Sequence, residues 1–186
     1  MANKVQKQSL FKQIGSIFFY IISGILVLYI ITEAFMPSMT IKVFQFKPYV
    51  VITESMEPVL NVNDMIIVYN PNVDKLEVED IITFEADIDY NGTKEIVTHY
   101  IYSITDDGEG NLTFRTIREG GTVPDTWILS EDDVIGVYGF KISQLGVFIN
   151  FVKSPFGIAA ILVNIGVIVA IVVLVKSDKK KTETKK

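Results

Sequence analysis

Two long apolar runs lie on either side of a stretch in which apolar and polar residues are mixed. The first run covers residues 14–32 without a charged residue, and the second covers residues 156–175. Each is close to the roughly 20 apolar residues that a helix needs to cross the hydrocarbon layer of a membrane. A lone segment in lipid must be helical, because only a helix pairs all of its own backbone groups. The pattern predicts transmembrane helices over residues 14–32 and 154–175.

The stretch between these runs, residues 33–153, has the pattern of a β-rich domain. Short segments rich in Val, Ile, Tyr, Phe and Thr alternate with clusters of turn-forming residues, and no segment has helical periodicity. The apolar run 147–152 is expected to lie at the membrane surface. The predicted strands cover residues 49–53, 65–69, 81–84, 96–104, 112–117 and 134–140. The predicted fold is therefore a mainly β domain with two flanking transmembrane helices.

The lysines around the apolar runs predict the orientation of the chain. Lys4, Lys7 and Lys12 precede the first run, and several further lysines follow the second. Positive flanks mark the cytoplasmic side of a membrane segment. We therefore expect residues 1–13 and the basic tail 176–186 to be cytoplasmic, and residues 33–153 to be extracytoplasmic, in a multi-pass protein of the cell membrane. The tail is also expected to contact anionic membrane lipid.

A cleavable secretion signal is the alternative interpretation of the first run. The apolar part of such a signal usually has about 7–15 residues, which is shorter than this run. The candidate cleavage site Thr32-Glu33-Ala34 also carries a charge at its centre. An uncleaved anchor is therefore the favoured interpretation.

Composition excludes several kinds of function. The chain has no cysteine and one histidine, so we expect no disulfide, no thiol catalysis and no metal site built from these residues. Residues 33–153 hold 8 of the 17 basic side chains and 20 of the 22 acidic ones, which argues against nucleic acid as a partner. The acidic segment 106–111 lacks the ligand spacing of an EF-hand and is interpreted as a hairpin turn.

Ser55 and His99 are the residues best suited to chemistry. Ser55 follows the apolar run 50–53, which places it at a predicted strand end, exposed but fixed by the sheet. A hydroxyl is a weak nucleophile until a base removes its proton, and histidine is the side chain whose ordinary pKa suits that base. A third group must orient the imidazole, and Glu119 and Asp125 are two of many candidates. These patterns leave a Ser-His-acid site and a purely structural His99 both open.

Four short motifs resemble those of type I signal peptidases. Ser55-Met56-Glu57-Pro58 is similar to their Ser-Met-x-Pro nucleophile box. Thr98-His99 is similar to the base box of the ER-type branch, which is also found in archaea and some Gram-positive bacteria. Residues 116–121, followed by Asp125, stand in the place of the acidic box, and residues 134–136 resemble the strand that closes the family's domain. The resemblance spans nearly the whole chain.

The resemblance implies an activity and a role for each of these residues. The protein would be a serine endopeptidase that removes signal peptides from exported preproteins held in the bilayer, and no cofactor is implied. Ser55 would be the nucleophile, His99 its base and Asp125 the acid that orients His99. Glu119 would be a supporting acid, and the Thr53 hydroxyl would join the backbone N–H of Ser55 in stabilising an oxyanion. The sequence does not specify partner subunits.

Several residues in and beside these motifs depart from the family's pattern, among them Thr53, where the family has Ser, and Ile117-Arg118, where it has Lys-Gly. Three further departures bear on the site. Glu54, Tyr100 and Glu119 stand where the family usually has Gly, Arg and Asp. Glu54 brings charge and bulk beside Ser55, which keeps a non-enzymatic alternative open. That alternative is an inactive pseudopeptidase that acts as a membrane scaffold for exported or surface-assembled proteins. A membrane-anchored β domain of unrelated function is a further alternative.

Overall fold

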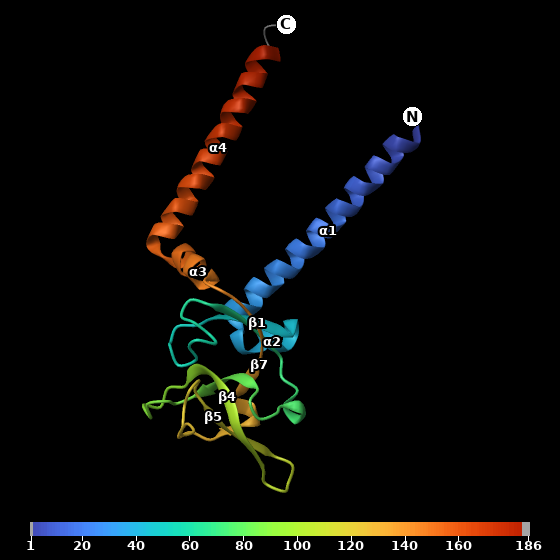
Figure 1. Cartoon of the computed structure of the whole chain (residues 1–186). Coiled ribbons are helices and arrows are strands. Elements are labelled where there is room, and N and C mark those ends of the chain that lie inside the picture. Colours follow the sequence, from blue (N-terminus) through green and yellow to red (C-terminus); the bar gives the residue numbers. More distant parts are fainter. Residues whose placement is uncertain (1, 184–186) are drawn as a thin grey trace.

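Two long apolar helices extend from one end of a small β domain (Figure 1). The computed structural model describes the backbone of residues 2–183 and the side chains of residues 13–174 and of Lys176. Helix α1 covers Ala2–Phe35 and helix α4 covers Pro155–Glu183. Their segments Gln13–Phe35 and Pro155–Leu174 are long and apolar enough to cross a membrane. Lys4, Lys7, Lys12 and the tail beyond Lys176 lie outside the residues whose side chains are described.

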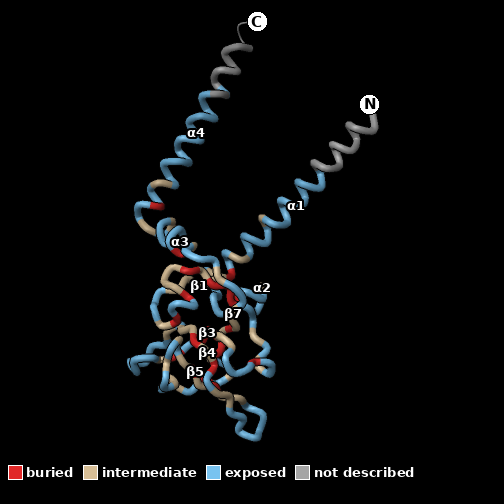
Figure 2. Tube along the Cα trace, viewed as in Figure 1, coloured by how far each residue is buried: buried red, intermediate tan, exposed pale blue. Residues whose placement is uncertain are grey.

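The described side chains of α1 and α4 are exposed along almost their whole length, whereas buried residues gather in the β domain (Figure 2). Phe19 in α1 is 65% exposed and Phe156 in α4 is 83% exposed. Soluble proteins rarely expose a continuous apolar surface of this size. Lipid tails cover such a surface at little cost, so both helices suit a membrane environment.

The β domain is built on one seven-stranded antiparallel sheet with the strand order β1-β2-β7-β3-β4-β5-β6. Strands β1 and β6 are its edges, and β7 lies between β2 and β3. The prediction of a mainly β domain with two apolar helices is thus confirmed. The strands cover Phe46–Val50 (β1), Met65–Tyr69 (β2), Ile81–Ala86 (β3), Glu95–Asp106 (β4), Leu112–Ile117 (β5), Leu129–Ser130 (β6) and Val134–Ile142 (β7).

Strand β1 starts and ends three residues earlier than the predicted strand 49–53. It contains Pro48, which lacks a backbone N–H and is tolerated because β1 is an edge strand. Beyond Val50 the pairing becomes irregular: the N–H of Val51 donates to the carbonyl of Asp64 at 2.9 Å, and its carbonyl accepts from the N–H of Asn63 at 2.9 Å. The chain then turns away from β2, so the apolar residues at 51–53 continue the strand pattern without being in the strand.

Two short helices correct the prediction that helices are confined to the membrane segments. Helix α2 covers Pro37–Phe44 and helix α3 covers Leu145–Lys153, and 3-10 turns cover Val73–Lys75 (η1) and Glu131–Asp133 (η2). With eight and nine residues, α2 and α3 are too short to show a clear helical period in sequence. The run 147–152 lies inside α3, where Val147, Phe148 and Phe151 are exposed.

Two buried clusters form the core of the domain. One gathers residues from the middle of the sheet and from the segments beside it, and the other lies under β1 and β2. Met56 and Leu60 belong to the second cluster and are 2% and 0% exposed. Met56 directly follows Ser55, and Leu60 lies at the end of the same turn. Their buried side chains therefore fix the backbone that carries Ser55. The first cluster consists of Leu76, Ile82, Phe84, Ala86, Ile101, Phe114, Leu129 and Val134.

The end of α1 is tied to the sheet by polar and aromatic contacts. The Lys47 ammonium on β1 lies 3.0 Å from Oε1 of Glu33 in α1 and donates to the Pro37 carbonyl at 2.9 Å. The Tyr29 ring packs against Phe44 and Phe46, with ring centroids 5.0 and 6.2 Å apart. These contacts set the position of the domain relative to the first apolar helix.

Asp64 ties the segment after the Ser55 turn to the start of α3. Its side chain is 1% exposed, and its carboxylate accepts from the Lys141 ammonium at 2.9 Å and from the N–H groups of Asn61 and Gln144 at 3.0 and 3.1 Å. Burial alone would raise the pKa of Asp64, but the hydrogen bonds from Lys141 and the two N–H groups outweigh it and lower the pKa.

We expect Asp64→Ala to destabilise the domain by about 1–3 kcal/mol, because it leaves the N–H groups of Asn61 and Gln144 without their acceptor and removes the ion pair with Lys141. That corresponds to a fall of roughly 5–10 °C in the melting temperature of the full chain in detergent. In the native protein the ionised Asp64 carboxylate contributes its full stabilisation above the ordinary pKa of 3.8. This stabilisation is lost as the pH falls through the lower pKa of the folded state. Asp74→Ala, at an exposed acid on η1, is the matched control and should melt with the native protein.

Candidate active site

Ser55 lies in a turn beyond β1, rather than directly at the end of the strand as predicted. The turn is closed by backbone bonds from Glu57 N–H to the Glu54 carbonyl at 3.1 Å and from Leu60 N–H to the Met56 carbonyl at 2.8 Å. The Ser55 carbonyl accepts from the N–H of Glu119 at 3.2 Å. Ser55 itself is half-buried. Its position is therefore fixed from both sides although it is outside the sheet.

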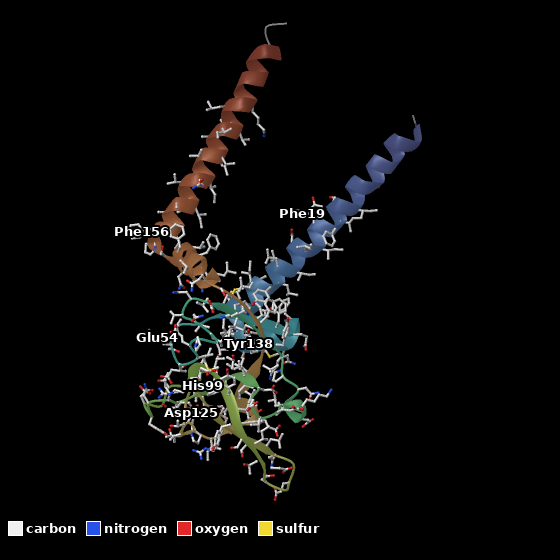
Figure 3. All side chains as sticks on the ribbon, in the orientation of Figure 1. Phe19, Glu54, His99, Asp125, Tyr138 and Phe156 are labelled. Atoms are coloured by element: carbon white, nitrogen blue, oxygen red, sulfur yellow. The ribbon has the colours of Figure 1, made fainter. Side chains whose placement is uncertain are left out.

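His99 is held inside the sheet on β4, where it pairs with Ile82 of β3. It is 5% exposed. Its Nδ1 lies 2.7 Å from Oδ2 of Asp125, and the two residues lie next to each other in Figure 3. Its ring stacks on Trp127, with centroids 6.3 Å apart and planes at 25°. The other ring nitrogen, Nε2, is buried and has no hydrogen-bond partner among the described residues.

Asp125 lies in the segment that follows β5 and folds back onto that strand. Its N–H donates to the Thr116 carbonyl at 2.8 Å, and its own carbonyl accepts from Nη2 of Arg115 at 3.0 Å. Burial works to raise the pKa of Asp125, but the hydrogen bonds from His99 and Thr116 outweigh it and lower the pKa. The carboxylate beside His99 is therefore ionised at neutral pH and accepts hydrogen bonds only.

Glu119 does not contact His99. Its Oε2 accepts from the Tyr100 hydroxyl at 2.7 Å, while its backbone N–H holds the Ser55 carbonyl. Burial, followed by the bond to Glu119, raises the pKa of Tyr100 to about 12. Two of the residues that depart from the family's pattern, Tyr100 and Glu119, thus contact each other and support the Ser55 turn. Glu54, the third, is exposed at the margin of the domain (Figure 3).

Ser55 and His99 line the same cavity, which has a volume of about 490 Å³. Thr53 lines it as well, and its hydroxyl oxygen lies 3.3 Å from that of Ser55. Besides Glu95 and Thr98, the remaining lining is mostly apolar. It comes from β1 and the Ser55 segment, from β2, from β4 and the loop before it, and from the segment between β5 and β6: Tyr49, Val50, Val51, Ile52, Met56, Leu60, Ile66, Ile88, Ile96, Val97 and Trp127. The site can therefore hold an extended, mostly apolar chain against a hydroxyl and an imidazole.

Two residues of the site, Thr116 and Trp127, were given no role from the sequence. The Thr116 hydroxyl donates to Oδ2 of Asp125 at 2.6 Å and accepts from Nε1 of Trp127 at 3.0 Å. Trp127 is the only tryptophan of the chain and stands two residues after Asp125. Thr116 is likewise the first residue of the segment that stands in the place of the acidic box. Neither signal reveals which atoms meet.

A small acidic group is the one set of described side chains close enough together to hold a metal ion. Ligand oxygens of Asp87, Asp89 and Glu95 lie within 4.8 Å of one another. Asp87 already accepts from the N–H groups of Asn91 and Gly92 at 3.0 and 2.9 Å, as expected of a side chain that closes a turn. These contacts account for the cluster without a cation.

Comparison with known proteins gives one family. No curated protein matches the chain. Residues 21–102 match the family model described as signal peptidase, peptidase S26. The match covers less than half of the chain, includes Ser55 and His99, and ends before Thr116 and Asp125. It supports a relationship of this chain to the type I signal peptidases.

Proposed function

We propose that this protein is a membrane-anchored serine endopeptidase that removes signal peptides from exported preproteins, with Ser55, His99 and Asp125 as its catalytic residues. The observation that carries the proposal is the geometry around His99. One ring nitrogen is 2.7 Å from the Asp125 carboxylate, and the ring lines one cavity with Ser55. This is the order of groups in which a carboxylate orients an imidazole and the imidazole activates a hydroxyl. The His base is the feature of the ER-type branch.

The proposed reaction is acyl transfer through Ser55. Nε2 of His99 takes the hydroxyl proton as the Ser55 oxygen bonds to the substrate carbonyl carbon. The N–H of Ser55 and the hydroxyl of Thr53 are the candidate donors for the resulting oxyanion. The tetrahedral intermediate expels the amine, which takes the proton from His99 and leaves an acyl-enzyme. Water then gives a proton to His99 and attacks the ester carbonyl. His99 returns that proton to the Ser55 oxygen as the carboxylic acid leaves, which restores both residues.

The lining of the cavity supports an extended substrate. Strand β1 is a sheet edge, and Val50, Val51 and Ile52, at its end, line the cavity beside Ser55. A peptide segment can add to such an edge through main-chain hydrogen bonds, with alternate side chains entering the cavity. We propose that residues with small side chains occupy the positions next to the cleaved bond.

The two apolar helices support a site of action at the membrane. We propose that α1 and α4 span it, with the termini cytoplasmic and residues 33–153 outside. The Lys47–Glu33 ion pair then holds the sheet, and with it the cavity, at a fixed height above the end of α1. A signal peptide held in the same bilayer would meet Ser55 at a high effective concentration.

Cleavage by the full-length protein in lipid vesicles tests the proposal. A preprotein with Ala before the cleavage site should be cut at one bond, which mass spectrometry of the product identifies. The same preprotein with Trp at that position should be cut at least about 10-fold more slowly, if small side chains are required next to the cleaved bond as proposed. Folded protein that leaves the Ala substrate intact would contradict the peptidase and favour the non-enzymatic membrane scaffold.

A further inference from the structure

A line of hydrogen bonds runs from Trp127 to His99 behind the cavity. Nε1 of Trp127 donates to the Thr116 hydroxyl at 3.0 Å, and that hydroxyl donates to Oδ2 of Asp125 at 2.6 Å. The same oxygen lies 2.7 Å from Nδ1 of His99. Thr116 is 0% exposed and the His99 side chain is 6% exposed, so water cannot readily replace these partners.

The direction of each bond in this line follows from the chemistry of its members. An indole N–H can only donate, so Thr116 accepts from Trp127 and keeps its single hydroxyl hydrogen for Asp125. An ionised carboxylate can only accept, so Nδ1 of His99 must carry the hydrogen that it shares with Oδ2. A neutral imidazole has one N–H, which leaves Nε2 as a bare acceptor. Nε2 is the nitrogen that has no partner among the described residues.

We propose that Thr116 and Trp127 are positioning residues that hold Asp125 as an aimed, ionised acceptor and so keep neutral His99 in the Nδ1–H form. Trp127 acts in two ways. Its N–H directs the Thr116 hydroxyl toward Asp125, and its ring stacks on His99 and packs against Phe84, with both centroid distances 6.3 Å. The use of this tautomer in catalysis rests on the proposed function. The tautomer itself follows from the hydrogen bonds and does not depend on that function.

The chain offers an unusually clean measurement, because His99 is its only histidine. Full-length protein labelled with ¹⁵N-histidine and purified without a histidine tag gives signals from one imidazole. At about pH 8.5, where an ordinary imidazole is neutral, the shifts of the two ring nitrogens report which one carries the hydrogen. We expect Nδ1–H to dominate in the native protein.

Four variants separate the parts of the line. Thr116→Val removes the hydroxyl at nearly constant volume and should raise the Nε2–H fraction and lower preprotein cleavage about 10- to 100-fold, the range for a lost hydrogen bond to a charged group. Thr116→Ser restores the hydroxyl and should recover both measurements. Trp127→Phe keeps an aromatic ring but removes the donor, and should shift the tautomer in the same direction by a smaller amount. Leu76→Ala loosens the same core at a residue that pairs with no member of the line, and should keep the native tautomer.

Two results would overturn the inference. One is a native protein whose neutral His99 is mainly in the Nε2–H form. The other is an unchanged tautomer ratio in both Thr116→Val and Trp127→Phe, and either variant suffices if the other does not fold. Native protein that holds the Nδ1–H form but cuts no preprotein would support the inference and overturn the proposed function.

Discussion

Ser55→Ala and His99→Ala are each expected to lower kcat/KM for preprotein cleavage by at least about 10⁴-fold, because a nucleophile and its base act as one unit. Removing the hydroxyl takes away the atom that forms the acyl-enzyme, and removing the imidazole takes away the base that accepts the hydroxyl proton. Both residues line this cavity, and the Ser55 turn is held by the buried Met56 and Leu60. The loss in Ser55→Ala should therefore be chemical, with folding intact.

The double variant Ser55→Ala/His99→Ala gives the sharper result. If the two residues form a unit, it should cut no more slowly than either single variant. If the fold losses in kcat/KM of the two single variants multiply in the double variant, the two residues have independent roles. Ser38→Ala is the matched control: Ser38 is followed by Met39 just as Ser55 is followed by Met56, but it lies exposed on α2. It should cut at the native rate.

The sequence was sufficient for the parts of this fold that depend on local pattern. The two apolar runs gave helices, and five of the predicted strands correspond to β2, β3, β4, β5 and β7. The position of β7 between β2 and β3 could not be predicted, since β7 lies far from both strands in the sequence. The end of β1 was misplaced because Val51, Ile52 and Thr53 have a strand-like pattern for a different reason: they line the cavity.

The contacts of the acidic residues could not be read from spacing. Strand β5 ends at Ile117, before both acids, so the pairing of β4 with β5 does not place either of them beside a residue of β4. The segment after β5 then folds back through the bond from Asp125 N–H to the Thr116 carbonyl. That fold brings Asp125 to His99 and leaves Glu119 beside Tyr100 and Ser55. Sequence motifs suggested both acids as candidates. Only the fold of the segment after β5 shows which residue each of them contacts.

Asp125→Asn and Glu119→Gln should therefore differ greatly, although each exchanges a carboxylate for its neutral isostere. In Asp125→Asn the carboxylate that holds Nδ1–H is lost, and a wrong tautomer in a Ser-His-Asp triad lowers kcat by about 10⁴-fold. In Glu119→Gln the amide oxygen can still accept from the Tyr100 hydroxyl, and the backbone bond to the Ser55 carbonyl is unchanged. We expect that variant to retain kcat/KM within about threefold, a change below that of one lost neutral hydrogen bond.

The two variants are best compared in one cleavage assay, beside the melting temperature of each full-length protein in detergent. A fall in kcat for Asp125→Asn at an unchanged melting temperature assigns the loss to chemistry. Equal losses in the two variants would contradict the assignment of Asp125 as the partner of His99 in catalysis. A large loss in Glu119→Gln alone would move the acid role to Glu119, which would require the segment between β5 and β6 to rearrange during the reaction, because Glu119 is bonded to Tyr100 in this structure.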